Sequence, residues 1–351
     1  MCSSFPCLGC CPRQRALHAE RSDSCVTTPV APRSPTAPRA TGVVTHLSFG
    51  SECGEIEILE TIAETLIDPL IGADIRAELQ NDAGIPFAAA RQRAVAKRLG
   101  EMSSQLETPN NILAIEYIKA IYNLGLNMKP VTIQRFGSGH DQMSGEGYKS
   151  AAEIRRMMIS GRDIAAVLPE SAYAVYKREE KLGRGPVVPE SLESAVISRL
   201  RMLPDEAYKR LPDAGEGLHN RVAKAAREEC SVDAILAAGK SKRYALSRIR
   251  RMVMCAALGI SADMADETPP YARVLAASVR GCELLHNMRQ TARIPIIIKP
   301  ADVKNCGDDC RKLFELGSGA HDLYVLGYAA RGERRGGSDW RTSPKIIAEN
   351  G

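Results

Sequence analysis

Four short motifs in this sequence carry residue types that bind nucleotides. The first is Phe49-Gly50-Ser51-Glu52, which lies where an apolar run ends and a helical pattern begins. A glycine at such a turn lets a ligand approach the backbone, and the amides that open the next helix can bind phosphate. Gly50 is therefore a candidate nucleotide contact. A turn glycine without a ligand explains the same pattern, so the motif alone leaves both interpretations open.

The second motif, Thr108-Pro109-Asn110-Asn111, opens a predicted helix. Thr108 suits the N-cap and Pro109 suits the first helical position. An asparagine amide at a helix start, such as that of Asn110, can bind an adenine edge, a ribose or a phosphate, and the helix dipole favours negative charge there. Helix capping without a ligand is the alternative.

The third and fourth motifs place cationic side chains beside a glycine-rich loop and a helix start. Arg135 follows a predicted strand and precedes the loop at 137–141, a position suited to clamping phosphates. Ser150 opens a predicted helix and Arg155 follows one and a half turns later, so hydroxyl, amides and guanidinium could converge on a triphosphate. The alternatives are an ordinary surface arginine for Arg135, and helix capping beside a solvent-facing arginine for the other two.

The strongest basic cluster lies between residues 240 and 251, where six of twelve side chains are cationic. Helical spacing predicts a shared face with a tyrosine ring beside it, which would suit contact with an RNA backbone and stacking on a base. A solvated basic helix is the alternative. The candidate nucleic-acid contacts are Lys242, Arg243, Tyr244, Arg248 and Arg251.

Histidines and cysteines give no metal site and no catalytic residue in this sequence. The six histidines lie far apart, and neither His-x-x-His nor His-x-Gly-His occurs. Cys7 and Cys10 form a Cys-x-x-Cys pair without a second ligand pair at finger-like spacing, so reduced thiols are the simpler interpretation. We therefore predict no bound metal, and the catalytic residues stay unknown.

Hydrophobic periodicity predicts the elements that must position these motifs. Apolar residues predict strands at 43–49 and 130–134, and helical spacing predicts helices from residue 56 to 66 and from 150 to 159. Another helix is expected over 87–99, with Pro86 at its first position. The helix that Thr108 opens is expected to end at Gly125. This alternation is typical of an α/β nucleotide-binding sheet.

The chain as a whole divides into four predicted parts. We interpret residues 1–41 as disordered or aberrant, 42–169 as a partial α/β nucleotide-binding domain, 170–262 as a helical domain, and 263–340 as a small α/β segment. Within that segment we expect strands at 295–299 and 323–326. No apolar run reaches the roughly 18 residues of a membrane helix, and the net charge of +5 is modest.

The order of these motifs resembles the tRNA(Met) cytidine acetate ligase family over roughly residues 42–340. The segments that carry the resemblance are Leu47–Gly54, Thr108–Lys119, Thr132–Arg135, Ser150–Arg155, Leu211–Leu218, Lys242–Arg251, Tyr271–Leu275 and Asp322–Gly327. It implies an enzyme that converts acetate and ATP into an acetyl-adenylate and acetylates the wobble cytidine of elongator tRNA(Met), giving N4-acetylcytidine. It also implies that Gly50, Asn110 and Arg135 contact ATP. Ser150 and Arg155 would then lie near the phosphates. The resemblance further implies that residues 42–169 form a partial nucleotidyltransferase-like ATP-binding domain and that the basic helical domain at 170–262 binds the tRNA.

The start of the chain departs from this family. The resemblance implies an N-terminal strand and a loop with paired histidines of the His-x-Gly-His type, whereas residues 1–41 are rich in cysteine, proline and arginine. The predicted fold class is therefore α/β: an incomplete Rossmann-like nucleotidyltransferase domain, then a mainly helical domain and a small α/β C-terminal segment. Two other functions stay open, a catalytically impaired tRNA-binding remnant and a nucleotidyltransferase that acts on a small molecule. We expect ATP with or without Mg²⁺, a cytoplasmic location and no membrane contact.

Overall fold

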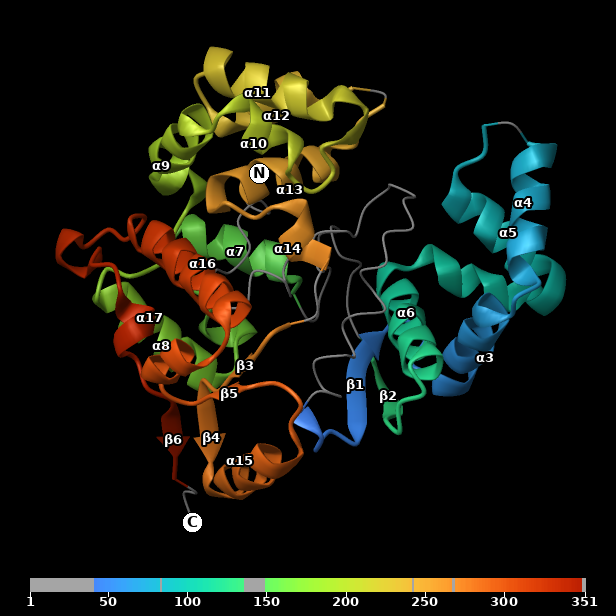
Figure 1. Ribbon diagram of the computed structural model, residues 1–351, viewed down its shortest axis with the longest axis horizontal. Helices are drawn as coiled ribbons and strands as arrows, with labels where there is room; N and C mark the ends of the chain where they lie inside the picture. The colour runs from blue at the N-terminus through green and yellow to red at the C-terminus, as the bar shows by residue number, and fades with distance from the viewer. Residues whose placement is uncertain (1–40, 83, 136–148, 242, 267–268, 349–351) are drawn as a thin grey trace. The chain divides into compact units, whose positions relative to one another are not determined.

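The computed structural model describes residues 41–82, 84–135, 149–241, 243–266 and 269–348 (Figure 1). These residues form two compact units. The sheet unit contains the described residues up to 135 together with 276–296 and 346–348, and the helical unit contains 149–275 and 297–345. The expected segment 1–41 and the glycine-rich loop at 137–141 lie outside the described residues, apart from residue 41.

Two parallel strands, β1 (His46–Ser51) and β2 (Lys129–Gln134), form a two-stranded sheet in the sheet unit (Figure 1). In their register Gly50 lies opposite Ile133, so both strands end at the same edge. Parallel neighbours need a long crossover, which the helices between them supply. Both predicted strands are confirmed. Val131 and Ile133 of β2 are exposed.

Four α-helices and a 3₁₀ helix make that crossover. They are α3 (Ile56–Ile67), α4 (Ile71–Asn81), α5 (Phe87–Leu99), η2 (Gly100–Glu107) and α6 (Pro109–Asn123). The predicted helices at 56–66, 87–99 and from Pro109 are confirmed, although Pro86 is the residue before α5 and not its first residue. Gly125 follows the end of α6 with a φ of +56°, which a glycine adopts without strain.

The core of the sheet unit forms where α3 packs on α6. Leu59, Ile62 and Ala63 recur at helical spacing on α3, and each is fully buried. They join Ile115 and Ile118 of α6 in one cluster. Burying a side chain of this size contributes about 1.5–3 kcal/mol, so these contacts hold the start of α6 beside the end of β1.

The helical unit is built almost wholly from helices. In order they are α7 (Ala151–Ile159), η3 (Ala165–Val167), α8 (Glu170–Lys181), α9 (Pro189–Met202), α10 (Asp205–Lys209), η4 (Gly215–Gly217), α11 (Leu218–Glu228), α12 (Val232–Gly239), α13 (Leu246–Leu258), α14 (Ala262–Asp266), η5 (Pro300–Asn305), α16 (Asp308–Val325), η6 (Arg331–Glu333) and α17 (Ser338–Arg341). Helices α9 to α13 enclose one apolar core. Within it the buried Tyr208 donates its O–H to the carbonyl of Leu200 at 2.8 Å, so burial leaves its hydroxyl satisfied.

Short strands and one further helix complete the described chain. They are β3 (Ala272–Arg273), β4 (Ala276–Ser278), α15 (Val279–Thr291), β5 (Ile296–Ile297) and β6 (Lys345–Ile347). Strand β5 pairs with β3, so the strand predicted at 295–299 is confirmed, although it is only two residues long.

The strand predicted at 323–326 is wrong. Residues 308–325 form the single helix α16, with Phe314, Ala320 and Val325 buried along it. A run of four apolar residues cannot distinguish a strand from the buried end of a helix, and the helical spacing upstream decides the outcome. In the part of the chain that the structure describes, no helix is long and apolar enough to cross a membrane.

Candidate nucleotide and RNA sites

The carboxyl edge of β1 and β2 brings together three of the predicted nucleotide contacts. Arg135 follows β2 directly, and its backbone N–H donates to the carbonyl of Ser51 at 2.9 Å, which extends the pairing past the last strand residue. Ligands of parallel α/β sheets bind outside the carboxyl ends of the strands. Gly50, Arg135 and the start of α6 with Asn110 therefore lie at the edge where ligands of this sheet type bind.

Gly50 lies against the side chain of Arg135. A Cβ added at Gly50 would lie 3.2 Å from Cγ and 3.4 Å from Cδ of Arg135, which is tight contact with the aliphatic stem. The arginine side chain thus crosses the backbone of β1 at the one position that has no side chain. Both residues are exposed, which leaves the guanidinium accessible to an anion.

The turn after β1 is fixed by a serine and a second glycine. Ser51 is fully buried, its hydroxyl lies 2.6 Å from the hydroxyl of Thr132, and it accepts the N–H of Gly54 at 3.0 Å. Gly54 has a φ of +74°, and a Cβ there would lie 2.7 Å from the Cβ of Gln134. Gly54 is therefore required by both conformation and space. In the sequence, the only sign of this role is that residue 54 is a glycine.

Glu52 caps helix α6 in place of the expected Thr108. Its Oε1 accepts the N–H of Asn110 at 3.1 Å and the side-chain amide of Asn110 at 2.6 Å, and its Oε2 accepts the N–H of Asn111 at 2.8 Å. Thr108 occupies the N-cap position, but its hydroxyl donates to Gln105 and caps nothing. Burial favours the neutral carboxyl, yet these hydrogen bonds outweigh it and lower the pKa of Glu52.

Asn111, on α6, forms hydrogen bonds in the opposite direction, from the helix to the turn after β1. Its Oδ1 accepts the N–H of Glu52 at 2.8 Å and that of Cys53 at 3.3 Å, and its amide nitrogen donates to Gln105 at 2.7 Å. The side chain is fully buried, so all of these bonds are shielded from water. Together, Glu52, Asn110 and Asn111 tie the end of β1 to the start of α6. We call these three residues the clasp.

Ser150 and Arg155 belong to the helical unit. The Ser150 hydroxyl accepts the N–H of Glu153 at 3.2 Å and caps α7, as the capping alternative predicted. Arg155 is exposed on the same helix.

The basic cluster is built around a buried ring. Tyr244 is 7% exposed and donates its O–H to the carbonyl of Glu216. The guanidinium groups of Arg243 and Arg248 lie 5.8 and 5.6 Å from its ring centre. The ring is therefore occupied by cation–π contacts and buried, and it offers no open face to a base. Helix α13 begins at Leu246, so Arg243 and Tyr244 precede the helix that was expected to include them.

Arg251 holds a loop together through Asp213. Its Nε lies 2.5 Å from Oδ2 of Asp213, and the two side chains are only 9% and 20% exposed. Asp213 has a φ of +64°, unusual for a residue with a side chain, and its carbonyl accepts Arg248 at 3.1 Å. Arg243 differs, because its side chain is 64% exposed. Lys242 lies outside the described residues.

A polar cluster that the sequence did not indicate joins α16 and α17. His321 Nδ1 lies 3.0 Å from Asp339 Oδ2, and Arg273 donates to the other carboxylate oxygen at 2.7 Å. The bond to Asp339 raises the pKa of His321 despite its partial burial. Desolvation would raise the pKa of Asp339, but its hydrogen bonds to His321 and Arg273 lower it. These residues are far apart in sequence, so no motif could reveal the cluster.

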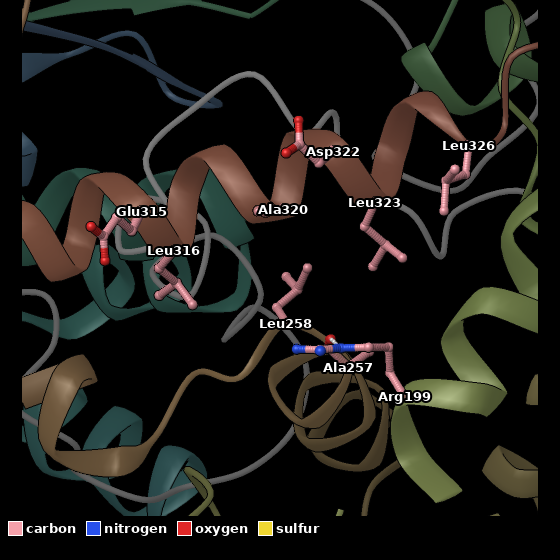
Figure 2. Close-up of a pocket in the computed structure, with 10 residues that line it drawn as sticks. Arg199, Ala257, Leu258, Glu315, Leu316, Ala320, Asp322, Leu323 and Leu326 are labelled. Carbon is pink, nitrogen blue, oxygen red and sulfur yellow. Dashed lines mark hydrogen bonds between the residues drawn. The ribbon is translucent and has the colours of Figure 1, made fainter. Parts of the chain in front are cut away.

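The helical unit also contains an open pocket of about 420 Å³ (Figure 2). Leu316 and Leu323 point from α16 toward Leu258, and Arg199 reaches in from α9, where its Nε donates to the carbonyl of Ala257 at 3.2 Å. The lining is mostly apolar. Among the described residues, no group of three or more His, Cys, Asp or Glu side chains could hold a metal ion.

Comparison with known proteins gives a consistent result along the chain. The family model for "HIGH Nucleotidyl Transferase" matches residues 37–339. The tRNA(Met) cytidine acetate ligase of Syntrophomonas wolfei is 31% identical over 319 residues, which cover 86% of this chain and 77% of that protein. The corresponding ligase of Caldanaerobacter subterraneus is 33% identical over 295 residues, covering 82% and 72% of the two chains.

Two solved structures have a similar fold. Apo Thermotoga maritima TmcAL superposes with a TM-score of 0.81 at 28% identity, covering 91% of this chain and 80% of that one. The same protein bound with alpha-thio ATP gives a TM-score of 0.79 at 27% identity, with the same coverage. The expected fold class, a nucleotidyltransferase-like α/β domain with mainly helical additions, is confirmed.

Proposed function

Because the chain belongs to the tRNA(Met) cytidine acetate ligase family of HIGH nucleotidyl transferases, we propose that it uses ATP to acetylate the wobble cytidine of elongator tRNA(Met). The product is N4-acetylcytidine, and the acetyl donor is an acetyl-adenylate made from acetate and ATP. The observation that carries this proposal is the meeting of Gly50, Asn110 and Arg135 at the carboxyl edge of β1 and β2. The proposal includes a cytoplasmic location.

The chemistry explains why ATP is needed. The cytosine amine is a weak nucleophile and acetate a poor electrophile, so acetate must first be activated. A carboxylate oxygen attacks the α-phosphorus, the bond to the bridging oxygen breaks, and pyrophosphate leaves. The cytidine N4 then attacks the acetyl carbonyl, AMP leaves, and N4 loses a proton. Charge develops on the α-phosphate in the first step, and a fixed cation stabilises it.

The sheet unit supplies groups that fit this need. Arg135 is an exposed guanidinium whose backbone is held to Ser51, so its charge is available at a defined edge. Gly50 leaves the backbone of β1 open beside it. Asn110 lies at the start of α6, held by Glu52. We assign ATP binding to these residues. We assign no catalytic acid or base among the described residues.

The helical unit supplies the proposed RNA contact. Arg243 is an exposed cation of the basic cluster, and we propose that Lys242 and Arg248 also contact the RNA. Tyr244 and Arg251 are buried, so they would support this surface by holding the loop at Asp213 and Glu216. The wobble base must be unstacked for its amine to react, which is how proteins usually read single-stranded loops.

We also propose that Ser150 and Arg155, on helix α7 of the helical unit, bind phosphate. Arg155 is exposed and can bind an anion, while the Ser150 hydroxyl already caps α7. Replacing Arg155 with alanine should therefore weaken ATP binding more than replacing Ser150 does.

The test is transfer of labelled acetate to elongator tRNA(Met) by the purified 351-residue protein with ATP, followed by nucleoside analysis. We expect label in N4-acetylcytidine, and none without ATP or with uridine at the wobble position. Arg135→Ala should lower the rate by about 10²–10³, the usual effect of losing a preorganised charge. Arg76→Ala, at another exposed arginine of the same unit, is the matched control and should keep the wild-type rate.

Two other outcomes would each replace this proposal. Salt-sensitive tRNA binding with no transfer of acetate would identify the chain as a tRNA-binding remnant, which the absence of His-x-Gly-His in the sequence favours. Release of pyrophosphate with a small acceptor, at a rate that tRNA does not change, would indicate a nucleotidyltransferase for small molecules.

A further inference from the structure

We propose that Cys306 and Cys310 form a dithiol modification site, at which a small-molecule disulfide oxidises the pair to an internal disulfide that free thiols reduce again. The two residues flank the start of α16. Cys306 follows the 3₁₀ helix η5 directly, and Cys310 lies in the first turn of α16. The proposed function uses neither residue, so the inference does not depend on it.

The fold of the helical unit brings the two thiols together. Cys310 is 3% exposed and belongs to a small buried apolar cluster, against which the half-buried Cys306 packs. The other members of the cluster are Ile297, Val303 and Phe314. The thiols of Cys306 and Cys310 are hydrogen-bonded to each other. A disulfide requires its sulfur atoms to approach to about 2 Å, and thiols that already touch need only a small change of rotamer for that.

Hydrogen bonds on both sides of the pair hold this geometry. On the side of η5, the N–H of Cys306 donates to the carbonyl of Val303 at 3.2 Å, and its thiol donates to the carbonyl of Asp302 at 3.4 Å. On the side of α16, the N–H of Arg311 donates to the carbonyl of Gly307 at 3.2 Å. Both sulfur atoms are therefore carried by backbone that is already fixed in the reduced protein.

The two thiols have different roles in the proposed reaction. Cys306 is the more accessible, so its thiolate attacks one sulfur of the small disulfide, the S–S bond of the reagent breaks, and one thiolate leaves. Cys310 then loses its proton to solvent, and its sulfur attacks Sγ of Cys306 and expels the second thiolate. The pair loses two protons and two electrons, and the reagent becomes two thiols. Burial and the hydrogen bond to Cys306 raise the pKa of Cys310, so it stays a thiol until Cys306 has reacted.

A metal ion is the other ligand that two neighbouring thiols suit. Structural zinc sites take four protein ligands. Within the described part of the chain, no third histidine, cysteine, aspartate or glutamate joins this pair in a group that could hold a metal ion. The pair is therefore better suited to oxidation than to metal binding.

The experiment treats the folded 351-residue protein with oxidised glutathione, blocks the remaining thiols with iodoacetamide and digests the protein with trypsin for mass spectrometry. Cleavage after Lys304 and Arg311 releases residues 305–311 as one peptide, which contains Cys306, Cys310 and no other cysteine. We expect this peptide to lack two hydrogen atoms and to escape alkylation, and dithiothreitol should restore two alkylated thiols. A peptide that stays alkylated at both cysteines, or that keeps a bound glutathione, would overturn the proposal.

Single variants test the order of the two steps. Cys310→Ala should stop with one glutathione bound to Cys306, and in Cys306→Ser the buried Cys310 should react about tenfold more slowly than that. Equal rates would contradict the assigned roles. Cys282→Ser, at an exposed cysteine of α15, is the matched control and should form the disulfide at the wild-type rate. Trp340 is the single tryptophan of the chain and contacts Phe314, so its fluorescence reports whether each variant is folded.

An equilibrium measurement separates the effect of the fold from that of the short spacing. Two cysteines four residues apart also form a disulfide in an unfolded chain, because the loop between them is short. If the fold holds the thiols together, the ratio of disulfide to dithiol at one ratio of oxidised to reduced glutathione should be about tenfold higher in the folded protein than in urea. An equal or lower ratio in the folded protein would show that the structure does not build this site.

Discussion

Replacing Arg251 with alanine should destabilise the helical unit without removing an RNA contact. The substitution leaves the Asp213 carboxylate without the guanidinium that lies 2.5 Å from it. Breaking a fully buried ion pair costs about 3–5 kcal/mol, and because Asp213 keeps 20% exposure, water recovers part of that loss. We therefore expect the free energy of unfolding to fall by about 2–3 kcal/mol.

Urea unfolding followed by circular dichroism measures this loss. The urea midpoint should fall while the slope m stays constant, because the surface exposed on unfolding does not change. Asp213→Asn is the complementary variant. Asparagine tolerates the φ of +64° at this position, so this change removes the charge of the pair without adding backbone strain.

Arg243→Ala is the matched control, because its side chain is 64% exposed. We expect a wild-type urea midpoint for this variant. The slope of the logarithm of tRNA affinity against the logarithm of salt concentration should become shallower by about 0.7–0.9, as for one lost phosphate contact. Arg251→Ala should keep the wild-type slope when the protein is folded. A wild-type midpoint together with a shallower slope for Arg251→Ala would refute the reasoning.

Three further predictions concern other parts of the chain. Gly54→Ala should lower the free energy of unfolding by about 2–4 kcal/mol, because the position has a positive φ and a Cβ there would contact β2. Gly125→Ala should lower it by about 1–2 kcal/mol, because that position has a positive φ but open space around it. Equal losses for the two variants would contradict the contact between residue 54 and β2. The bond to Asp339 raises the pKa of His321 above its ordinary 6.5, so its stabilisation is complete below pH 6.5 and is lost as the pH rises through the higher folded value. His321→Gln should remove that part of the decline in unfolding free energy, and an unchanged pH profile would count against the ion pair. Burial raises the pKa of Cys255 to about 12, so at pH 8 a thiol reagent should label the exposed Cys230 rapidly and Cys255 only on unfolding.

Sequence patterns alone predicted most of the elements around the nucleotide site. Apolar runs predicted β1 and β2, and Pro109 marked the first residue of α6, because strand alternation and proline geometry are local properties. The ordered motifs identified the family, and the glycine at position 50 was recognised as a place of close approach. The residue that approaches it, Arg135, was named separately but not as its neighbour.

Only the tertiary structure decided how those residues act on one another. Thr108 has the right type and place to cap α6, yet Glu52, more than fifty residues earlier, takes that role because the parallel pairing of β1 and β2 brings its turn to the helix. The sequence predicts that Tyr244 is an exposed ring in a basic segment, available for stacking on a base. In the structure the ring is buried, and two arginines lie against it. Hydrogen bonds and ion pairs of this kind join positions that are distant in sequence, so their geometry depends on packing that no local pattern encodes.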